Sequence, residues 1–230
     1  MERALEAAGD PRRAIAVAKF FKTGKGEYGD GDRFIGITAP TLRKIAQQHV
    51  ALGFGELKRL LASPIHEYRM ATLEILVAQY ERAGEAERER IVAFYLRHTW
   101  RMNNWDLVDA SAPYILGEHL KARPRKVLDR LAASTNLWER RIAIVSTLGL
   151  IRAGEIKQTY RIARKLLADK HDLIHKAVGW ALRETGKISP EELVGFLRRN
   201  YPNIPRTSLR YAIERFPAAQ RKKMLAGKFS

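Results

Sequence analysis

The sequence predicts an all-α fold in which paired helices stack as repeats. Three observations support this prediction: helix-start signals recur along the chain, no segment alternates as a half-buried strand does, and similar helical segments return at a regular spacing. The expected architecture is a solenoid, a superhelix of paired antiparallel helices. Each repeat of a solenoid buries its helices only against neighbouring repeats.

Helix starts are marked by a capping side chain that stands directly before a proline. This pattern occurs at Asp10-Pro11, Ser63-Pro64 and Ser189-Pro190. A side-chain oxygen at the N-cap accepts a hydrogen bond from the first free N–H groups, and proline is tolerated at the first helical position. Ser189 and Glu192 also have the spacing of a capping box. We expect helices to begin at all three places.

Four segments align in register on an alanine. They are HEYRMATLEIL, LWERRIAIVSTL, LIHKAVGWALRE and SLRYAIERF, which share Ala71, Ala143, Ala177 and Ala212. The last three alanines are about 35 residues apart, and the first gap is about twice as long, which leaves a place that Ala110 fills. A period of this length that holds two helices and no strand is typical of a HEAT-like solenoid.

The segment 137–152 supports a layered arrangement. After its charged start, this segment is apolar on nearly every face. A helix of that kind lies sandwiched between layers, as the inner helices of a stacked array do. Its polar end, Trp138 to Arg141, is then the part that meets a ligand.

Composition and charge describe a globular protein that binds a polyanion. Hydrophobic residues make up 46% of the chain and charged residues 29%, which is the usual mix for a folded protein. We expect one repeat domain over residues 1–230, with a flexible tail from about residue 225. The 42 lysines and arginines outnumber the 25 acidic residues and give a net charge of +17 that is spread along the chain. Nucleic acid is the commonest partner of such a surface.

Several classes of protein and site are excluded by what the sequence lacks. It has no cysteine, which excludes disulfides, thiolate nucleophiles and cysteine-ligated metals. Its first residues have no apolar core of a signal peptide, and its longest nearly apolar run, 142–151, is too short to span a membrane. We expect a soluble cytoplasmic monomer that is nucleoid-associated when bound to DNA and has no membrane contact.

Two further patterns have a structural interpretation. Gly24, Gly26 and Gly29 form a literal GxGxxG, but they follow a helical run instead of a strand. We interpret this segment as an ordered connecting loop beside a ligand surface. His171 and His175 have the four-residue spacing of two metal ligands, but no third ligand accompanies them. We therefore expect neither a metal nor another cofactor.

The stretch NNWDLVDASAP, residues 103 to 113, combines an aromatic residue with two acids on a basic chain. Trp105 and Asp109 are four residues apart, so on a helix their side chains are neighbours. Two interpretations stay open. In the first, Asn103 or Asn104 caps a helix, Asp106 complements its positive end and Trp105 packs in the core. In the second, the stretch is a functional site.

Three motifs in order give the chain a family resemblance. The combination NNWDLVDASAPYILG, NLWERRIAI and HDLIHKAVGWALRE resembles the AlkD-like DNA alkylation repair glycosylases, which are HEAT-like repeat proteins. The similarity runs from FFKTGKGEYGDGDRFIGITAP to RTSLRYAIERFP, nearly the whole chain. The resemblance implies a glycosylase that excises N3-methyladenine and N7-methylguanine from duplex DNA in base excision repair, and that captures the lesion without an enclosed pocket.

The resemblance also implies site residues. The catalytic Asp of the family's W-D-x-x-D motif matches Asp109, and the Trp of that motif matches Trp105. The Arg of N-x-W-x-x-R matches Arg141, and the Trp of K-A-x-G-W matches Trp180. The N-terminal aromatic contact of the family is usually a tyrosine, and Phe20 stands there, which keeps the ring and loses the hydroxyl.

The repeat register agrees with this assignment. Counted from the repeat alanines at about 100° per residue, the side chains of Trp105, Asp109, Arg141 and Trp180 fall within an arc of roughly 140°. Successive inner helices would then aim them at one concave surface. There Asp109 would stabilise an oxocarbenium-like sugar, the two tryptophans would hold the cationic lesion, and Arg141 would hold a phosphate.

Two other functions remain open. The first is a catalytically silent relative that binds nucleic acid through the same scaffold, which the phenylalanine at position 20 favours. The second is a HEAT-repeat scaffold for protein interaction, in which the positive charge meets an acidic protein. Base release from alkylated DNA and salt-dependent DNA binding distinguish these functions from the glycosylase.

Overall fold

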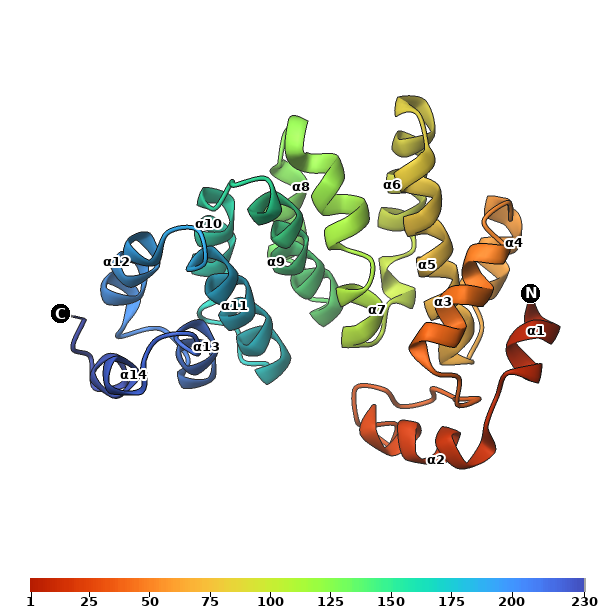
Figure 1. The fold of residues 1–230 in the computed structure, drawn as a ribbon, viewed down its shortest axis with the longest axis horizontal. Coiled ribbons are helices and arrows are strands. Elements are labelled where there is room, and N and C mark those ends of the chain that lie inside the picture. The colour runs from red at the N-terminus through yellow and green to blue at the C-terminus, as the bar shows by residue number, and fades with distance from the viewer. Residues whose placement is uncertain (230) are drawn as a thin grey trace. The chain divides into compact units, whose positions relative to one another are not determined.

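The structure is a computed structural model that describes residues 1–229, and helices dominate it (Figure 1). Fourteen α-helices run through these residues, together with two short 3-10 helices and one π-helical segment. Across residues 1–229 there is no strand, and the only sheet-like pairing there is an isolated bridge between Arg33 and Ile65. The prediction of an all-α fold is confirmed.

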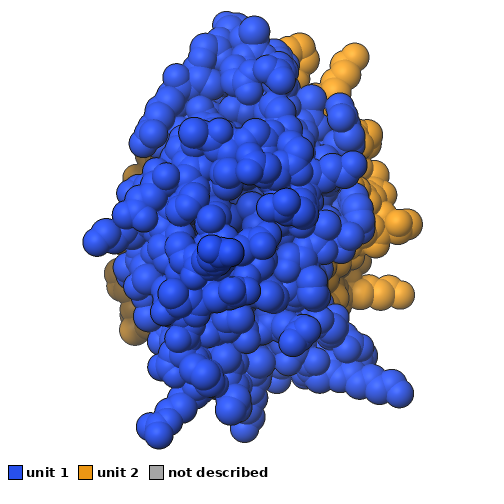
Figure 2. Space-filling view, turned by 90° about the vertical axis from the view of Figure 1, so that its right-hand side faces the viewer, with its two compact units in different colours: residues 1–111 blue, residues 112–230 orange. Residues whose placement is uncertain are grey.

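The chain divides into two compact units, which Figure 2 shows in different colours. Unit 1 comprises residues 1–111, and unit 2 begins at residue 112. The helices of unit 1 are α1 (Glu2–Ala7), α2 (Pro11–Phe20), α3 (Ala39–Gln48), α4 (Phe54–Leu61), α5 (His66–Arg82), α6 (Glu85–Arg97), η1 (Thr99–Arg101) and α7 (Trp105–Asp109). Helix α5 is the centre of this unit, because α1, α3, α4, α6 and α7 all pack against it.

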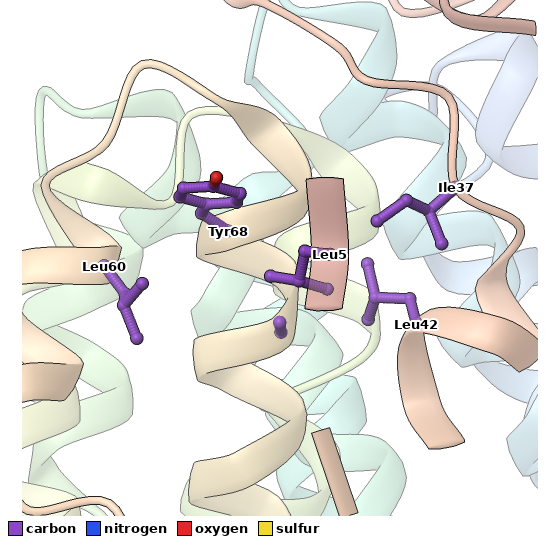
Figure 3. Packing of buried hydrophobic residues seen from close by; sticks show 6 residues of the cluster. Leu5, Ile37, Leu42, Leu60 and Tyr68 are labelled. Carbon is purple, nitrogen blue, oxygen red and sulfur yellow. The ribbon is translucent and has the colours of Figure 1, made fainter. Parts of the chain in front are cut away.

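An apolar cluster joins the N-terminal helix to α5. Its members are buried side chains from α1, the segment before α3, α3, α4 and α5: Leu5, Ile37, Leu42, Leu60, Tyr68 and Ala71. Leu5 lies among the other labelled side chains of the cluster in Figure 3. Complete burial of a leucine side chain contributes about 1.5–3 kcal/mol. This cluster therefore holds α1, although a helix of six residues would not be stable alone.

Two of the three predicted helix starts are confirmed. The carboxylate of Asp10 accepts hydrogen bonds from the backbone N–H groups of Arg12 and Arg13 at 2.9 and 3.3 Å. The hydroxyl of Ser189 accepts from the N–H of Glu192 at 3.3 Å. Each capped helix begins at the proline that follows the cap, as the sequence pattern indicates.

The third predicted start, at Ser63-Pro64, is wrong, because α5 begins at His66 with Ile65 as its N-cap. A bridge to a distant segment explains the difference. The carbonyl of Pro64 accepts from the N–H of Arg33 at 3.0 Å, and the carbonyl of Arg33 accepts from the N–H of His66 at 2.8 Å. These bonds hold residues 64 and 65 outside the helix, and the Ser63 hydroxyl accepts from the N–H of Ile65.

A single carboxylate binds the extended segment that leads into α3. Glu67, in the first turn of α5, is buried, and its Oε1 accepts from the backbone N–H groups of Ile35, Gly36 and Ile37 at 3.2, 2.7 and 3.4 Å. A buried backbone N–H needs a partner, and in a sheet a neighbouring strand would supply it. Here the side chain of Glu67 takes the place of that strand.

Unit 2 contains two layers of helices. Its elements are η2 (Pro113–Gly117, a π-helical segment), η3 (Leu120–Ala122), α8 (Lys126–Ala132), α9 (Leu137–Arg152), α10 (Lys157–Leu166), α11 (Asp172–Thr185), α12 (Pro190–Asn200), α13 (Arg206–Ala212) and α14 (Ala218–Leu225). Helices α9, α11 and α13 pack side by side in one layer. Helices α8, α10 and α12 form the other: α8 packs on α10, and the rings of Tyr160 and Phe196 stack between α10 and α12.

Helix α9 is buried on nearly every side, as its sequence predicts. Every residue from Arg141 to Ile151 is buried, and α9 contacts α8, α10, α11 and η2. The contact with η2 requires glycine. A Cβ atom on Gly149 would lie 2.6 Å from the carbonyl oxygen of Pro113 and 2.8 Å from the Cα atom of Gly117. The two backbones therefore touch directly at this point.

The repeat register holds for four of the five alanines. Ala71, Ala143, Ala177 and Ala212 lie on α5, α9, α11 and α13, and each is at most 1% exposed. The helical repeat is therefore confirmed at these positions.

Ala110 departs from this register, because it is half-buried and caps the five-residue helix α7 instead of lying inside a long helix. Proline at position 113 has no N–H to give to the carbonyl four residues earlier, so the α-helical ladder cannot continue there. The chain changes to a π-helical register, in which the N–H of Gly117 donates to the carbonyl of Ala112.

No helix in the described part of the chain is both long and apolar enough to cross a membrane.

Candidate functional site

Helix α7 carries the central residues of the predicted site. The side-chain oxygen of Asn104 accepts from the N–H of Trp105 at 2.9 Å and caps the helix, as one interpretation of the sequence expects. Leu107 is buried below the helix, while Trp105 and Asp109 are half-buried on it. The stretch is therefore a capped helix start whose tryptophan and acid remain accessible.

Aromatic rings from α2 and its C-cap surround Trp105. The ring of Phe21 stacks on the indole with centroids 5.3 Å apart and planes 24° apart. Phe20 meets the same indole edge-on at 6.0 Å, and its side chain is 64% exposed. The structure thus brings together Phe20 and Trp105, which are 85 positions apart in the sequence. An exposed ring beside a half-buried indole is a surface on which a flat ligand can stack.

Asp109 ends α7 and lies near the phenol of Tyr95. Tyr95 is fully buried, and its hydroxyl lies 3.1 Å from the hydroxyl of Ser111. Burial raises the pKa of Tyr95 above its ordinary value, and the negative charge of Asp109 raises it further. The phenol therefore stays neutral beside the carboxylate. Asp109 is therefore placed beside a buried polar group.

A buried charged network underlies α7, and no motif in the sequence predicts it. His66, the first residue of α5, is 3% exposed. Its Nε2 lies 2.8 Å from Oδ2 of Asp106, and its Nδ1 lies 3.3 Å from Oδ2 of Asp32. Arg69, one turn further along α5, places Nη2 2.6 Å from the same oxygen of Asp32. Two carboxylates and two basic side chains thus alternate at the base of the helix.

The pKa values of this network reflect burial and pairing. Burial alone would lower the pKa of His66, but its hydrogen bond to Asp106, the charge of Asp106 and the bond to Asp32 outweigh it and raise the pKa to about 8. Burial alone would raise the pKa of Asp32, but the bond from His66 and the charge of Arg69 outweigh it and lower the pKa. Near neutral pH the pair is therefore a carboxylate and an imidazolium.

The glycine-rich segment around Gly24, Gly26 and Gly29 is an ordered loop, as predicted. Asp32, at its end, belongs to this network. No strand precedes the loop, since it runs from the end of α2 to the segment before α3. The Asp30 carboxylate accepts from the N–H of Gly26 at 2.8 Å, and Gly26 has a positive φ of 78°. Asp32 then accepts from the amide of Asn103 at 2.8 Å. The loop therefore contacts the chain directly before α7.

In unit 1, a cavity of about 440 Å³ opens beside the rings of Phe20 and Phe21. Its walls are mostly apolar and come from α2, α3 and α5, and from the segment between α2 and α3. Phe20, Phe21 and Phe34 line it, and His66 and Asp106 form part of its polar edge. A hollow that has aromatic walls and a few charged groups fits a planar organic ligand.

Arg141 and Trp180 belong to unit 2. Arg141, in α9, is 5% exposed, and its Nη1 donates to the carbonyl of Leu173 at 2.6 Å, near the start of α11. Trp180 lies half-buried on α11. Trp138, in the same motif as Arg141, is buried, and its backbone N–H donates to the capping side chain of Asn136. The bond to Leu173 joins α9 to α11.

His171, the N-cap of α11, and His175, within α11, make structural hydrogen bonds. Nδ1 of His171 accepts from the N–H of Leu173 at 3.2 Å and so caps the helix. Nε2 of His175 lies 2.5 Å from the carbonyl oxygen of Asp169. Over residues 1–229, no cluster of three or more histidine or acidic side chains is arranged to hold a metal ion.

Comparison with known proteins identifies the family. The family model described as "DNA alkylation repair enzyme" matches residues 1–216. Among solved structures, the chain is similar to one described as "Predicted DNA alkylation repair enzyme from Enterococcus faecalis", with 18% sequence identity, a TM-score of 0.71, and coverage of 91% of this chain and 97% of that one. The curated proteins include no match. Since the family model covers nearly the whole chain, the protein belongs to the DNA alkylation repair enzyme family.

Proposed function

We propose that this protein is a DNA glycosylase that excises positively charged N-alkylated purines, such as N3-methyladenine and N7-methylguanine, from duplex DNA. The observation that carries the proposal is the geometry of α7, where Asp109 shares a five-residue helix with Trp105 and an exposed Phe20 adjoins that indole. The family membership and the net charge of +17 favour DNA as the substrate.

The chemistry of the lesion fits a site with one carboxylate. Alkylation of a ring nitrogen makes the base cationic, so it is already a good leaving group. As the C1′–N bond breaks, its electron pair stays on the base nitrogen that was bonded to C1′, and the base leaves as a neutral molecule. The oxygen of a water molecule bonds to C1′, and a proton of that water is released. Asp109 stabilises the cationic sugar and orients the water.

Trp105 and Phe20 supply the surface that holds the lesion. An aromatic face attracts a cation by roughly 0.5–2 kcal/mol, depending on how dry the contact is. In unit 2, the family motifs assign DNA contacts to two residues: an aromatic face at Trp180 and a phosphate contact at Arg141. Because Arg141 also bonds to Leu173, its replacement is expected to affect the packing of α9 against α11 as well as DNA binding.

Replacement of Asp109 by asparagine tests the proposal. We expect the Asp109→Asn variant to lose base release from methylated duplex DNA while its DNA affinity stays within about twofold of the wild-type value, since the side chain has the same size. Glu87→Gln is the matched control, because it removes one negative charge from an exposed ion pair on α6 of the same unit.

The outcomes separate the three functions. Release by the wild type and the Glu87→Gln control, but not by Asp109→Asn, supports the assignment. Undiminished release by Asp109→Asn removes Asp109 from the catalytic role. DNA binding without any release by the wild type indicates a catalytically silent relative, and absence of DNA binding at low salt indicates a scaffold for proteins.

A further inference from the structure

His66 occupies an unusual position, because both of its ring nitrogens are paired and its ring packs against two phenylalanines. Both ring nitrogens face carboxylates, Asp106 on one side and Asp32 on the other. Two aromatic rings pack against the imidazole: Phe34 stacks at 4.6 Å and Phe21 lies at 5.2 Å, and these two rings also stack on each other at 5.3 Å. A side chain with four such contacts and 3% exposure is held in one orientation.

Two of these four neighbours lead directly to Trp105. Asp106 is the next residue of α7, and Phe21 stacks on the indole itself. His66 therefore contacts both Asp106, which follows Trp105 in the chain, and Phe21, whose ring stacks on the indole of Trp105. Helix α7 has only five residues, too few to keep its orientation without such contacts.

We propose that His66, bridging Asp32 and Asp106, is a positioning residue that fixes the turn of α7 on which Trp105 and Asp109 meet alkylated DNA. This inference rests on the proposed glycosylase function for its effect on catalysis. His66 itself touches neither substrate nor the reacting atoms in this proposal. Its effect is on the position and orientation of α7 relative to α5.

The hydrogen bonds require a particular protonation state. A carboxylate only accepts hydrogen bonds, so two carboxylates on the two ring nitrogens require two N–H donors and hence an imidazolium. The charged groups that face His66 are Asp32 from the loop after α2, Asp106 from α7, and Arg69 from α5 itself. Glu67, the next residue of α5, is turned to the backbone of residues 35–37. The raised pKa of His66, about 8, agrees with this geometry.

Loss of one proton therefore breaks one of the two bridges. A neutral imidazole has a single N–H, so above a pH of about 8 either Asp106 or Asp32 loses its donor. If Asp106 loses it, α7 loses this hydrogen bond to α5. If Asp32 loses it, Asp32 keeps its contacts with Arg69 and Asn103, but the bridge through His66 between the loop and α7 is broken. In either case α7 becomes less constrained, and the rate of base release should fall although DNA binding continues.

The experiment compares His66→Gln with His98→Gln. His98 is a matched control, because it is a buried histidine of the same unit that packs on a phenylalanine and bonds a backbone carbonyl, with no carboxylate on either nitrogen. We expect His66→Gln to slow single-turnover release of N3-methyladenine by about 10- to 100-fold, the usual cost of a small misplacement. Its DNA affinity should change by less than about twofold.

The pH profile separates positioning from general loss of stability. Wild-type release, corrected for release without protein, should fall as pH rises through about 8, and His98→Gln should keep that profile. His66→Gln should show a slow rate with no inflection there. A wild-type rate with an unchanged inflection in His66→Gln overturns the proposal. Circular dichroism verifies that each variant folds. If His66→Gln does not fold, Asp106→Asn replaces it in the same comparison, because the side chain of Asp106 is more exposed than that of His66.

A second measurement keeps this inference distinct from the proposed function. The indole N–H resonance of Trp105, assigned by its absence in Trp105→Phe, reports the position of the ring without any substrate. It should shift in His66→Gln and stay in place in His98→Gln. If the wild type releases no base, the glycosylase proposal has failed, and this resonance alone decides the role of His66. An unchanged Trp105 resonance in His66→Gln overturns the positioning role.

Discussion

The indole of Trp105 and the ring of Phe21 lie face to face, with centroids 5.3 Å apart and planes 24° apart. Phe21 is the C-cap of α2, so this stack joins the second helix of unit 1 to its last helix. The neighbouring Phe20 contacts the same indole only with its edge and is mainly exposed. Phe21 thus supports the indole of Trp105, whereas Phe20 remains exposed at the surface beside it.

Replacement of each phenylalanine by leucine should separate these roles. Phe21→Leu is expected to destabilise the protein by about 0.5–1.5 kcal/mol through the lost stack, in addition to the smaller apolar area. Phe20→Leu should change stability by less than about 0.5 kcal/mol, since its side chain is exposed, while it weakens binding to alkylated DNA. Thermal unfolding measures the stability of both variants, and titration with alkylated DNA measures their affinity. Equal loss of stability in the two variants would contradict the assignment.

Gly149 should not tolerate a side chain. Its Cβ atom would meet backbone atoms of Pro113 and Gly117 at less than 3 Å, and backbone cannot move aside as a flexible side chain can. Gly149→Ala is therefore expected to destabilise the protein by about 1–3 kcal/mol, as measured by urea unfolding. Gly55→Ala is the control, since Gly55 lies within α4 with open space around its Cβ position and alanine there should stabilise by about 0.5–1 kcal/mol.

Stability should fall at alkaline pH because of His66. Its folded pKa, about 8, lies above the ordinary value of 6.5, so the stabilisation is fully present below pH 6.5 and is lost as pH rises through about 8. The shift corresponds to about 2 kcal/mol as an order of magnitude. Urea unfolding at pH 6 and pH 9 should show this difference in the wild type and not in His66→Gln. The same pH dependence in both proteins would assign it to other groups.

DNA binding should weaken with salt, and Arg141 should contribute to the slope. For a phosphate contact, Arg141→Ala should weaken binding uniformly and reduce the slope of log affinity against log salt by about 1. Arg152→Gln is a control at the opposite end of α9, where the guanidinium pairs with Glu118. Since Arg141 is buried, thermal unfolding of both variants must accompany the titration. An unchanged slope in Arg141→Ala would remove it from the phosphate role.

Local signals in the sequence predicted the fold well. Caps at Asp10 and Ser189, the apolar faces of α9 and the spacing of the repeat alanines all act within a few turns of one helix or between equivalent helices. The helix start predicted at Ser63-Pro64 is wrong because a bridge from Arg33, some 30 positions away, holds the backbone there out of a helix. Proline 113 likewise altered the register after Ala110 through a missing donor.

The candidate site was predicted only where its residues lie in a motif. Trp105 and Asp109 are close in the sequence and share α7. The contacts of His66 with Asp32 and Asp106 span 34 and 40 positions and follow no period, so no pattern along the chain indicates them. The structure shows that His66, Glu67 and Arg69 at the start of α5 are all buried, and charged side chains are seldom buried without partners.

The bond between Glu67 and the backbone of residues 35–37 also governs which changes in length the N-terminal part of the chain can accept. One carboxylate sets the register of this segment, so an added or deleted residue there would move α2 away from α7 and leave a buried charge without its donors. The exposed turn around Lys25 and Gly26 has no such attachment to another helix. Insertions in related chains should therefore accumulate in that turn and be absent between positions 33 and 38.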